Sequence, residues 1–191
     1  MTQLVEAGDY ESATVQEITR RAGCSVGAFY GRFKDKNAAL YALYDARCER
    51  LEGRILPVLK AGAAPDAPLA ATLRAVIHAT VENAAAGAAF IRAENFLTSH
   101  ASAEPFWARA KLMNGRFYKA LHKVLEAKTH EHAHPDPSTA ALFVLAIIGG
   151  LPRDAVKIGP KLFEENLATR EIFEAELNRI ICGYLGVAAS H

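Results

Sequence analysis

The chain has 191 residues, of which 51% are hydrophobic and 23% charged, and its formal net charge is +1. This composition is typical of a globular protein with one large or two small domains, and the near-neutral charge argues neither for nor against a nucleic-acid partner. No apolar run reaches the roughly 18 residues of a membrane span, and the N-terminus lacks the features of a secretory signal, so we expect no membrane partner.

The three cysteines, Cys24, Cys48 and Cys182, lie far apart without a CxxC pair. This spacing fits a reducing compartment better than a disulfide framework or a structural zinc site. We therefore expect a cytoplasmic protein without a cofactor.

Apolar residues recur at three- and four-residue spacing along most of the chain, which predicts an all-α fold. The expected helices cover 1–7, 15–22, 26–32, 36–60, 68–86, 88–100, 104–130, 138–158 and 168–186. Proline and glycine break the pattern at 61–68, 132–138 and 158–161. The pattern indicates a small N-terminal head of three helices, residues 1–46, followed by a larger helical body, residues 47–191.

The head contains two short helices joined by a tight turn. Thr14 and Glu17 have the spacing of a capping box, in which each side chain reaches the other residue's backbone amide. Gly23 fits the left-handed position that ends a helix, and Ser25 is a suitable N-cap for the next one. Helix, glycine turn and helix together predict a helix-turn-helix, whose second helix enters the DNA major groove.

The second helix and the start of the third complete the head. Phe29 and Phe33 are four residues apart and are expected to pack against the first helix of the pair. Asp35 is the expected N-cap of the third helix, which places Lys36 beside a helix N-terminus, where a phosphate is favoured. Between residues 14 and 36, five basic side chains stand against two acidic ones.

The run "GDYESATVQEITRRAGCSVGAFYGRFKDKNAALYAL", residues 8–43, resembles the DNA-binding head of the TetR/AcrR family of bacterial transcriptional regulators. It covers about a fifth of the chain. The matching positions are Gly8, Thr14, Val15, Ile18, Ala22, Gly23, Ser25, Gly27, Tyr30, Phe33, Lys36 and Leu40. The resemblance implies that Thr14, Ser25, Tyr30 and Lys36 hold phosphates. It implies that Val26, Gly27, Ala28, Gly31 and Arg32 face the groove.

The sequence departs from the family pattern at three points. Val26 stands where the family often has lysine or another polar residue, and Gly31 where it often has an aromatic residue or histidine. We therefore expect Arg32 and Gln16 to supply the polar base contacts. Only "MTQLVEA" precedes Gly8, whereas family members usually have about two more turns of first helix. Either the true N-terminus lies upstream of Met1, which we favour, or the first helix is truly short.

The resemblance implies that the body binds a ligand and forms a homodimer through its last two helices. The segment 140–151 is apolar on nearly every side, and the final helix carries a broad apolar stripe. The alternative is that both helices only form the core of one protomer. The predicted interface residues are Leu145, Ile148, Phe173, Leu177, Ile180, Ile181 and Tyr184.

The resemblance also implies a pocket for a small effector, which the mixture of aromatic residues with few charges suggests is apolar or aromatic. These side chains could equally be ordinary core residues. The pocket candidates are His78, Phe90, Asn95, Phe96, Trp107, Met113 and Phe117.

Other chemistry is disfavoured. His130, His132 and His134 are two residues apart, so they do not share one helical face, and we expect no metal site. Cys24 is expected to be a small buried side chain. The sequence has no GxSxG, HExxH, phosphate-loop or dinucleotide motif, so we do not expect an enzyme.

The sequence therefore predicts a ligand-responsive DNA-binding transcriptional regulator, a repressor that binds double-stranded DNA at a pseudopalindromic operator as a homodimer. The alternative is a helical ligand-binding or interaction protein whose head binds DNA poorly. The short first helix, Val26 and Gly31 are the features that favour this alternative.

Overall fold

The computed structural model describes residues 12–88, 90, 91, 104–157 and 169–187, and among these residues the regular secondary structure is helix, without any strand. The expected all-α fold is confirmed. The expected helix over 1–7 and most of that over 88–100 lie outside the described residues. The helices are α2 (Val15–Ala22), α3 (Val26–Tyr30), α4 (Lys36–Gly62), α5 (Leu69–Ala86), α7 (Glu104–Ala127), α8 (Pro137–Lys157) and α10 (Arg170–Leu185).

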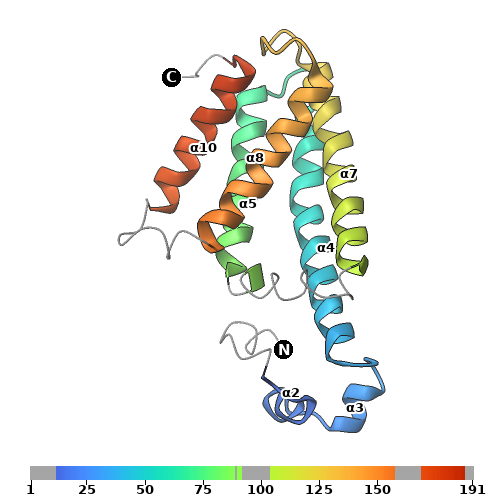
Figure 1. The fold of residues 1–191 in the computed structure, drawn as a ribbon. Coiled ribbons are helices and arrows are strands. Elements are labelled where there is room, and N and C mark those ends of the chain that lie inside the picture. The colour runs from blue at the N-terminus through green and yellow to red at the C-terminus, as the bar shows by residue number, and fades with distance from the viewer. Residues whose placement is uncertain (1–11, 89, 92–103, 158–168, 188–191) are drawn as a thin grey trace.

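Helices α2 and α3 form a small head with the first turn of α4, at one end of the molecule (Figure 1). Phe29 of α3 and Ile18 of α2 are almost fully buried against each other. Phe33 packs at the edge of the same cluster, its ring centroid 5.5 Å from that of Phe29, as the sequence predicts. The buried members of this head core are Ala13, Ile18, Phe29 and Ala39.

Helix α4 connects the head to the body without interruption. It has 27 residues, so at 1.5 Å per residue it is about 40 Å long. Ala39 belongs to the head core, Leu40 and Tyr44 pack with Phe90 and Phe106 of the body, and the later turns enter the main core. The boundary expected between residues 46 and 47 thus falls inside one continuous helix.

The body is built from α4, α5, α7, α8 and α10 packed side by side (Figure 1). Helix α4 packs on α5 and α7, both of which pack on α8, while α10 packs on α5 and α8. The shared core is aliphatic with one phenylalanine, Phe117. Its fully buried side chains include Leu59, Leu69, Leu121, Leu125, Val144, Ile181 and Leu185.

The turn between α4 and α5 is held by residues that follow α7. The Lys128 side chain is almost completely buried, and its Nζ donates to the Pro65 carbonyl at 2.9 Å. The Glu131 carboxylate accepts a hydrogen bond from the Leu69 backbone N–H at 2.6 Å, and this bond lowers the pKa of Glu131. Because Pro68 provides no side-chain cap for α5, Glu131 takes that role from another part of the chain.

A buried ionic cluster joins α4 to α7. The Arg109 side chain is only 8% exposed, and its Nη1 lies 3.0 Å from the Glu52 carboxylate. Its Nε donates to Asp45, and Arg116 also reaches Glu52, at 2.9 Å. The hydrogen bonds that Arg109 donates to Glu52 raise the pKa of Arg109 despite its burial. Two cations and two carboxylates therefore balance each other at the α4–α7 contact.

Helix α8 is unusually apolar for a helix that is partly uncovered. The helix has 21 residues, and an 18-residue stretch of it has a mean hydropathy of 1.5, which is long and apolar enough to cross a membrane by length and composition, yet only 28% of that stretch is buried. Core helices of soluble proteins share this composition. Leu142, Phe143 and Leu151 are all exposed, so α8 has an apolar face that the described residues leave uncovered.

We expect Arg109→Met to lower the free energy of unfolding by about 3–5 kcal/mol, because it leaves the buried Glu52 carboxylate without its main partner. Arg54→Met is the matched control, since Arg54 also joins two helices through a glutamate, Glu82, but is 48% exposed. Its loss should cost at most about 1 kcal/mol. Urea unfolding at one fixed protein concentration measures both, and equal losses would contradict the prediction.

Candidate functional site

The two ends of α2 are formed as the sequence predicts. Thr14 Oγ1 accepts a hydrogen bond from the Glu17 backbone N–H at 3.2 Å. At the other end Gly23 adopts φ +65°, the left-handed conformation that favours glycine, and the Cys24 N–H donates back to the Thr19 carbonyl at 3.0 Å. This turn brings α3 into position after only three intervening residues.

The second half of the expected capping box is replaced by an ion-pair cluster. The Glu17 carboxylate accepts hydrogen bonds from Arg20 at 2.7 and 2.9 Å and from Arg21 at 2.7 Å. These bonds, first from Arg20 and then from Arg21, lower the pKa of Glu17 to about 2. Part of the positive charge expected on this surface is therefore offset within α2 itself.

Helix α3 is short and is anchored by one side chain. Ser25 Oγ caps it by accepting from the Ala28 N–H at 3.0 Å, and Phe29 is its buried residue, 6% exposed. The helix ends at Tyr30 instead of residue 32, with Gly31 as its C-cap. The Tyr30 ring packs edge-on against Phe29, with centroids 5.5 Å apart, and remains 55% exposed.

The residues predicted to contact DNA lie on the surface of the head. A Cβ added to Gly27 would meet only Ser25 Oγ, at 3.9 Å, so the backbone there is open to a close approach. A Cβ at Gly31 would lie 3.3 Å from the Gly27 carbonyl. The exposed predicted residues are Thr14, Gln16, Ser25, Val26, Gly27, Ala28, Tyr30, Gly31 and Arg32.

Lys36 is half-buried, in contrast to these residues. Its Nζ donates to the Ala13 carbonyl at 3.1 Å, so its ammonium lies beside the start of α2 as well as in the first turn of α4. Asp35 caps α4 through the Ala38 N–H at 2.7 Å, as expected. Cys24, in contrast, is exposed, so the expectation that it is buried is wrong: the Gly23 turn directs it away from the head core.

The body contains a cavity of about 840 Å³ between α4, α5, α7 and α8. This volume suits a small-molecule ligand. Four of the predicted pocket residues, Phe90, Trp107, Met113 and Phe117, lie on its wall. Further lining residues include Tyr44, Arg47, Cys48, Leu51, Ile55, Thr80, Asn83, Ala84, Phe106, Asn114, Tyr118, Leu142, Leu145 and Ile148.

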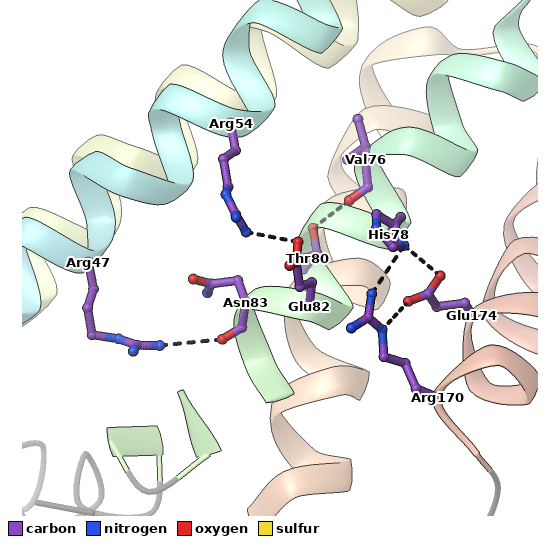
Figure 2. Close-up of polar contacts among 9 residues, drawn as sticks. All are labelled: Arg47, Arg54, Val76, His78, Thr80, Glu82, Asn83, Arg170 and Glu174. Atoms are coloured by element: carbon purple, nitrogen blue, oxygen red, sulfur yellow. Dashed lines mark hydrogen bonds and ion pairs between the residues drawn. The ribbon is translucent and has the colours of Figure 1, made fainter. Parts of the chain in front are cut away.

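His78 does not line this cavity, so its prediction as a pocket residue is corrected. It projects from α5 toward α10, where its Nδ1 lies 2.9 Å from Glu174, which also binds Arg170 (Figure 2). The pairing with α10 accounts for its direction. Asn95 and Phe96, the other two candidates, lie outside the described residues.

The predicted interface residues fall into two groups. Ile148, Leu177 and Ile181 are at most 4% exposed, so the core of the protomer already accounts for their apolar character. Leu145, Phe173 and Tyr184 are half-buried, and Ile180 is 49% exposed. The predicted apolar surface of α8 and α10 therefore has two sides: a core side that is buried within the chain, and an outer side that is at least partly exposed.

The outer side also contains apolar residues that are not in the predicted interface set. Phe143 of α8 is 56% exposed, and its ring centroid lies 6.0 Å from that of Tyr184 on α10. Ile172 of α10 is 53% exposed. Helical periodicity marks such residues as apolar, but it cannot tell which side of an all-apolar helix the chain itself covers.

The part of the cavity wall that belongs to α4 and α5 was not predicted from the sequence. Tyr44, Arg47, Thr80 and Asn83 are ordinary helical residues in the sequence, and only the packing of α4 on α5 brings them to one cavity. Thr80 Oγ1 is turned to the Val76 carbonyl of its own helix at 2.8 Å (Figure 2). Among the described residues no three His, Cys, Asp or Glu side chains gather as a metal site would require.

The fold has a helix-turn-helix head that one helix joins to an all-helical body. This arrangement is typical of DNA-binding regulators with two domains. Comparison with known families agrees. Residues 2–43 match the family described as "Bacterial regulatory proteins, tetR family", and residues 68–185 match "Tetracyclin repressor-like, C-terminal domain". The chain therefore belongs to the TetR family of transcriptional regulators, which are transcription factors and not enzymes.

Solved structures share the whole fold. A tetR-family regulatory protein from Rhodococcus RHA1 is 23% identical over 98% of this chain and 94% of its own, with a TM-score of 0.68. A transcriptional regulator from Rhodococcus sp. Rha1 is 24% identical, over 100% and 95% of the two chains, with a TM-score of 0.69. The fatty acid degradation regulator FadR from Bacillus halodurans is 16% identical, over 98% and 93%, with a TM-score of 0.71. No curated protein sequence matches the chain.

We expect Gly23→Ala to lower the free energy of unfolding by about 1–2 kcal/mol, because alanine is strained at positive φ. Gly53→Ala is the matched control in the interior of α4, where an added Cβ meets nothing within 4 Å. That change should instead stabilise by about 0.5–1 kcal/mol. Thermal unfolding followed by circular dichroism gives both signs, and stabilisation by Gly23→Ala would contradict the turn geometry.

Proposed function

We propose that this protein is a repressor that binds a pseudopalindromic operator as a homodimer and leaves it when a small apolar or aromatic effector enters the body. The observation that carries the proposal is that α4 begins in the head core and then forms one wall of the cavity. A ligand that binds one arrangement of α4 better than another biases the position of the head by the same free energy.

The surface of the head supports DNA binding. Tyr30 and Arg32 are exposed at the end of α3, while Phe29 on its other side is fixed in the core. A recognition helix held in this way can enter the major groove, where Arg32 would read a guanine and Val26 a thymine methyl. Thr14, Ser25, Tyr30 and Lys36 would hold the backbone phosphates that set its position.

The outer faces of α8 and α10 support a dimer. Phe143, Tyr184 and Ile180 form an apolar surface across the two helices, and exposed apolar patches of this kind mark protein interfaces. A two-fold dimer would place two heads about 34 Å apart or somewhat more, on successive turns of the same face of DNA. We propose that the protein works in the cytoplasm, where such a regulator meets DNA.

The alternative, a ligand-binding protein whose head binds DNA poorly, depends on the small side chains of α3. Gly27, Ala28 and Gly31 leave few groups that reach base edges. The open backbone at Gly27 argues against this alternative, because close approach to DNA adds phosphate contacts that need no long side chain. DNA binding distinguishes the two functions directly.

We expect the double variant Tyr30→Ala/Arg32→Ala to bind the DNA upstream of its own gene at least about tenfold more weakly than the unmodified protein, through loss of a phosphate contact and a base contact. Arg50→Ala is the control: this exposed arginine lies on α4, 14 residues beyond Lys36, which is about 21 Å along the helix. Gel-shift titration measures both. Undiminished binding by the double variant would show that α3 is not the recognition helix.

We expect Phe143→Glu/Ile180→Glu to weaken dimerisation at least about 100-fold, because two unpaired carboxylates per protomer would lose water on association. Leu112→Glu is the control, since Leu112 is equally exposed, at 52%, but lies on α7. Size-exclusion chromatography with light scattering, run over a dilution series, gives the mass of each. A double variant that stays dimeric would place the interface elsewhere.

A further inference from the structure

The described wall of the cavity has an uneven charge. Three cationic side chains lie on it, Arg47 from α4, Lys111 from α7 and Arg153 from α8, and none of the described lining residues is Asp or Glu. The rest of the wall is mostly aliphatic and aromatic. A cavity of this kind favours a ligand that is apolar over most of its length and negatively charged at one point.

Arg47 is the cation whose position the fold fixes. It extends from α4 to the last turn of α5, where its Nη2 lies 3.5 Å from the Asn83 carbonyl oxygen (Figure 2). Its guanidinium carbon also lies 5.0 Å from the centroid of the Phe90 ring. At 3.5 Å the hydrogen bond is weak, so the carbonyl orients the guanidinium without cancelling its charge.

The chain leaves room for this guanidinium by placing a glycine opposite it. A Cβ on Gly87, the C-cap of α5, would lie 1.7 Å from Arg47 Nη2 and 2.5 Å from its Cζ. Gly87 has φ −108°, so its backbone does not itself require glycine. The space it provides is therefore filled by Arg47, and any larger residue would displace the guanidinium from its place beside Phe90.

We propose that the effector is an amphipathic carboxylate, a hydrocarbon chain or aromatic group that carries one acidic group, and that Arg47 binds the carboxylate. This inference rests on the proposed effector function of the cavity. The guanidinium offers N–H donors in a planar fork that matches a carboxylate. It is also less strongly hydrated than an ammonium group, which favours pairing with an anion away from bulk water.

The position of Arg47 also links the carboxylate of the ligand to α4, the helix that continues into the DNA-binding head. Tyr44 and Leu51, one turn away on either side, line the same cavity. A carboxylate on Arg47 would draw the guanidinium from the Asn83 carbonyl and thus change the contact between α4 and α5. The apolar body would fill the space bounded by Phe106, Met113 and Phe117.

The test compares three probes that share a ten-carbon chain and differ only in the head: decanoate, 1-decanol and decyltrimethylammonium. Trp107 is the single tryptophan of the chain and lies on the cavity wall, so its fluorescence reports binding directly. Titrations are made below the micelle concentration at pH 7, with isothermal calorimetry as a second measurement. We expect decanoate to bind at least about tenfold more tightly than decanol, and the cation most weakly.

The variant Arg47→Gln should remove this preference by weakening decanoate at least about tenfold while leaving decanol within about twofold. Gly87→Ala keeps the charge but displaces it, and should reduce the preference as well. Arg54→Gln is the matched control: Arg54 is also on α4 and reaches α5 (Figure 2), but it pairs with Glu82 and does not line the cavity. It should bind all three probes like the unmodified protein, and circular dichroism confirms that each variant is folded.

Equal affinity for decanoate and decanol, no binding of any probe, or a preference that survives Arg47→Gln would each overturn the proposal. The same probes added to a gel shift separate it from the effector function. If decanoate binds through Arg47 but leaves the DNA complex intact, the ligand class stands and the proposed release mechanism fails. If DNA binding itself is absent, the fluorescence titration still decides the ligand class.

Discussion

The structure depends on the continuity of α4 through two hydrophobic cores. Ala39 contributes to the head core, and Ile55 and Leu59, about four to six turns later, are buried in the body. The described part of the head has few buried side chains, and thus little apolar area with which to offset its loss of conformational entropy. Because its third helix is the start of α4, the head gains order from the body, and its orientation follows that of α4.

This constraint explains why a helix as weak as α3 can present a recognition surface. Five residues that include a glycine would not form a helix alone. The helix is fixed near each of its ends: Ser25 caps the start, Phe29 enters the head core, and a short turn leads from its end to α4. With the backbone held from beneath, the outer residues are free to be small, as Gly27 and Ala28 are.

Most of the fold and the surface of the head could be predicted from the sequence, because they depend on local rules. Capping residues, the Gly23 turn and the four-residue spacing of Phe29 and Phe33 act within a few residues of each other. The cavity could not be predicted in the same way. Arg47 becomes a lining residue only when α4 packs on α5, and His78 faces α10 because Glu174, 96 residues later, draws it there. The Arg109 cluster likewise joins residues 57 and 64 positions apart.

The two sides of α4 are held with very different strength, and this determines where the body can adjust. On the α7 side, Asp45 and Glu52 are tied to the buried Arg109, and separating such a pair costs several kcal/mol. On the α5 side, the polar contacts of the described residues include the exposed Arg54–Glu82 pair and the 3.5 Å bond from Arg47 to Asn83, each worth at most about 1 kcal/mol. We therefore expect α4 and α7 to move as one unit and the α4–α5 contact to be where a ligand acts. Arg47 and part of the cavity wall lie at that contact. A bound molecule would therefore touch the part of the body that can change with the smallest loss of free energy. That part leads directly to the head.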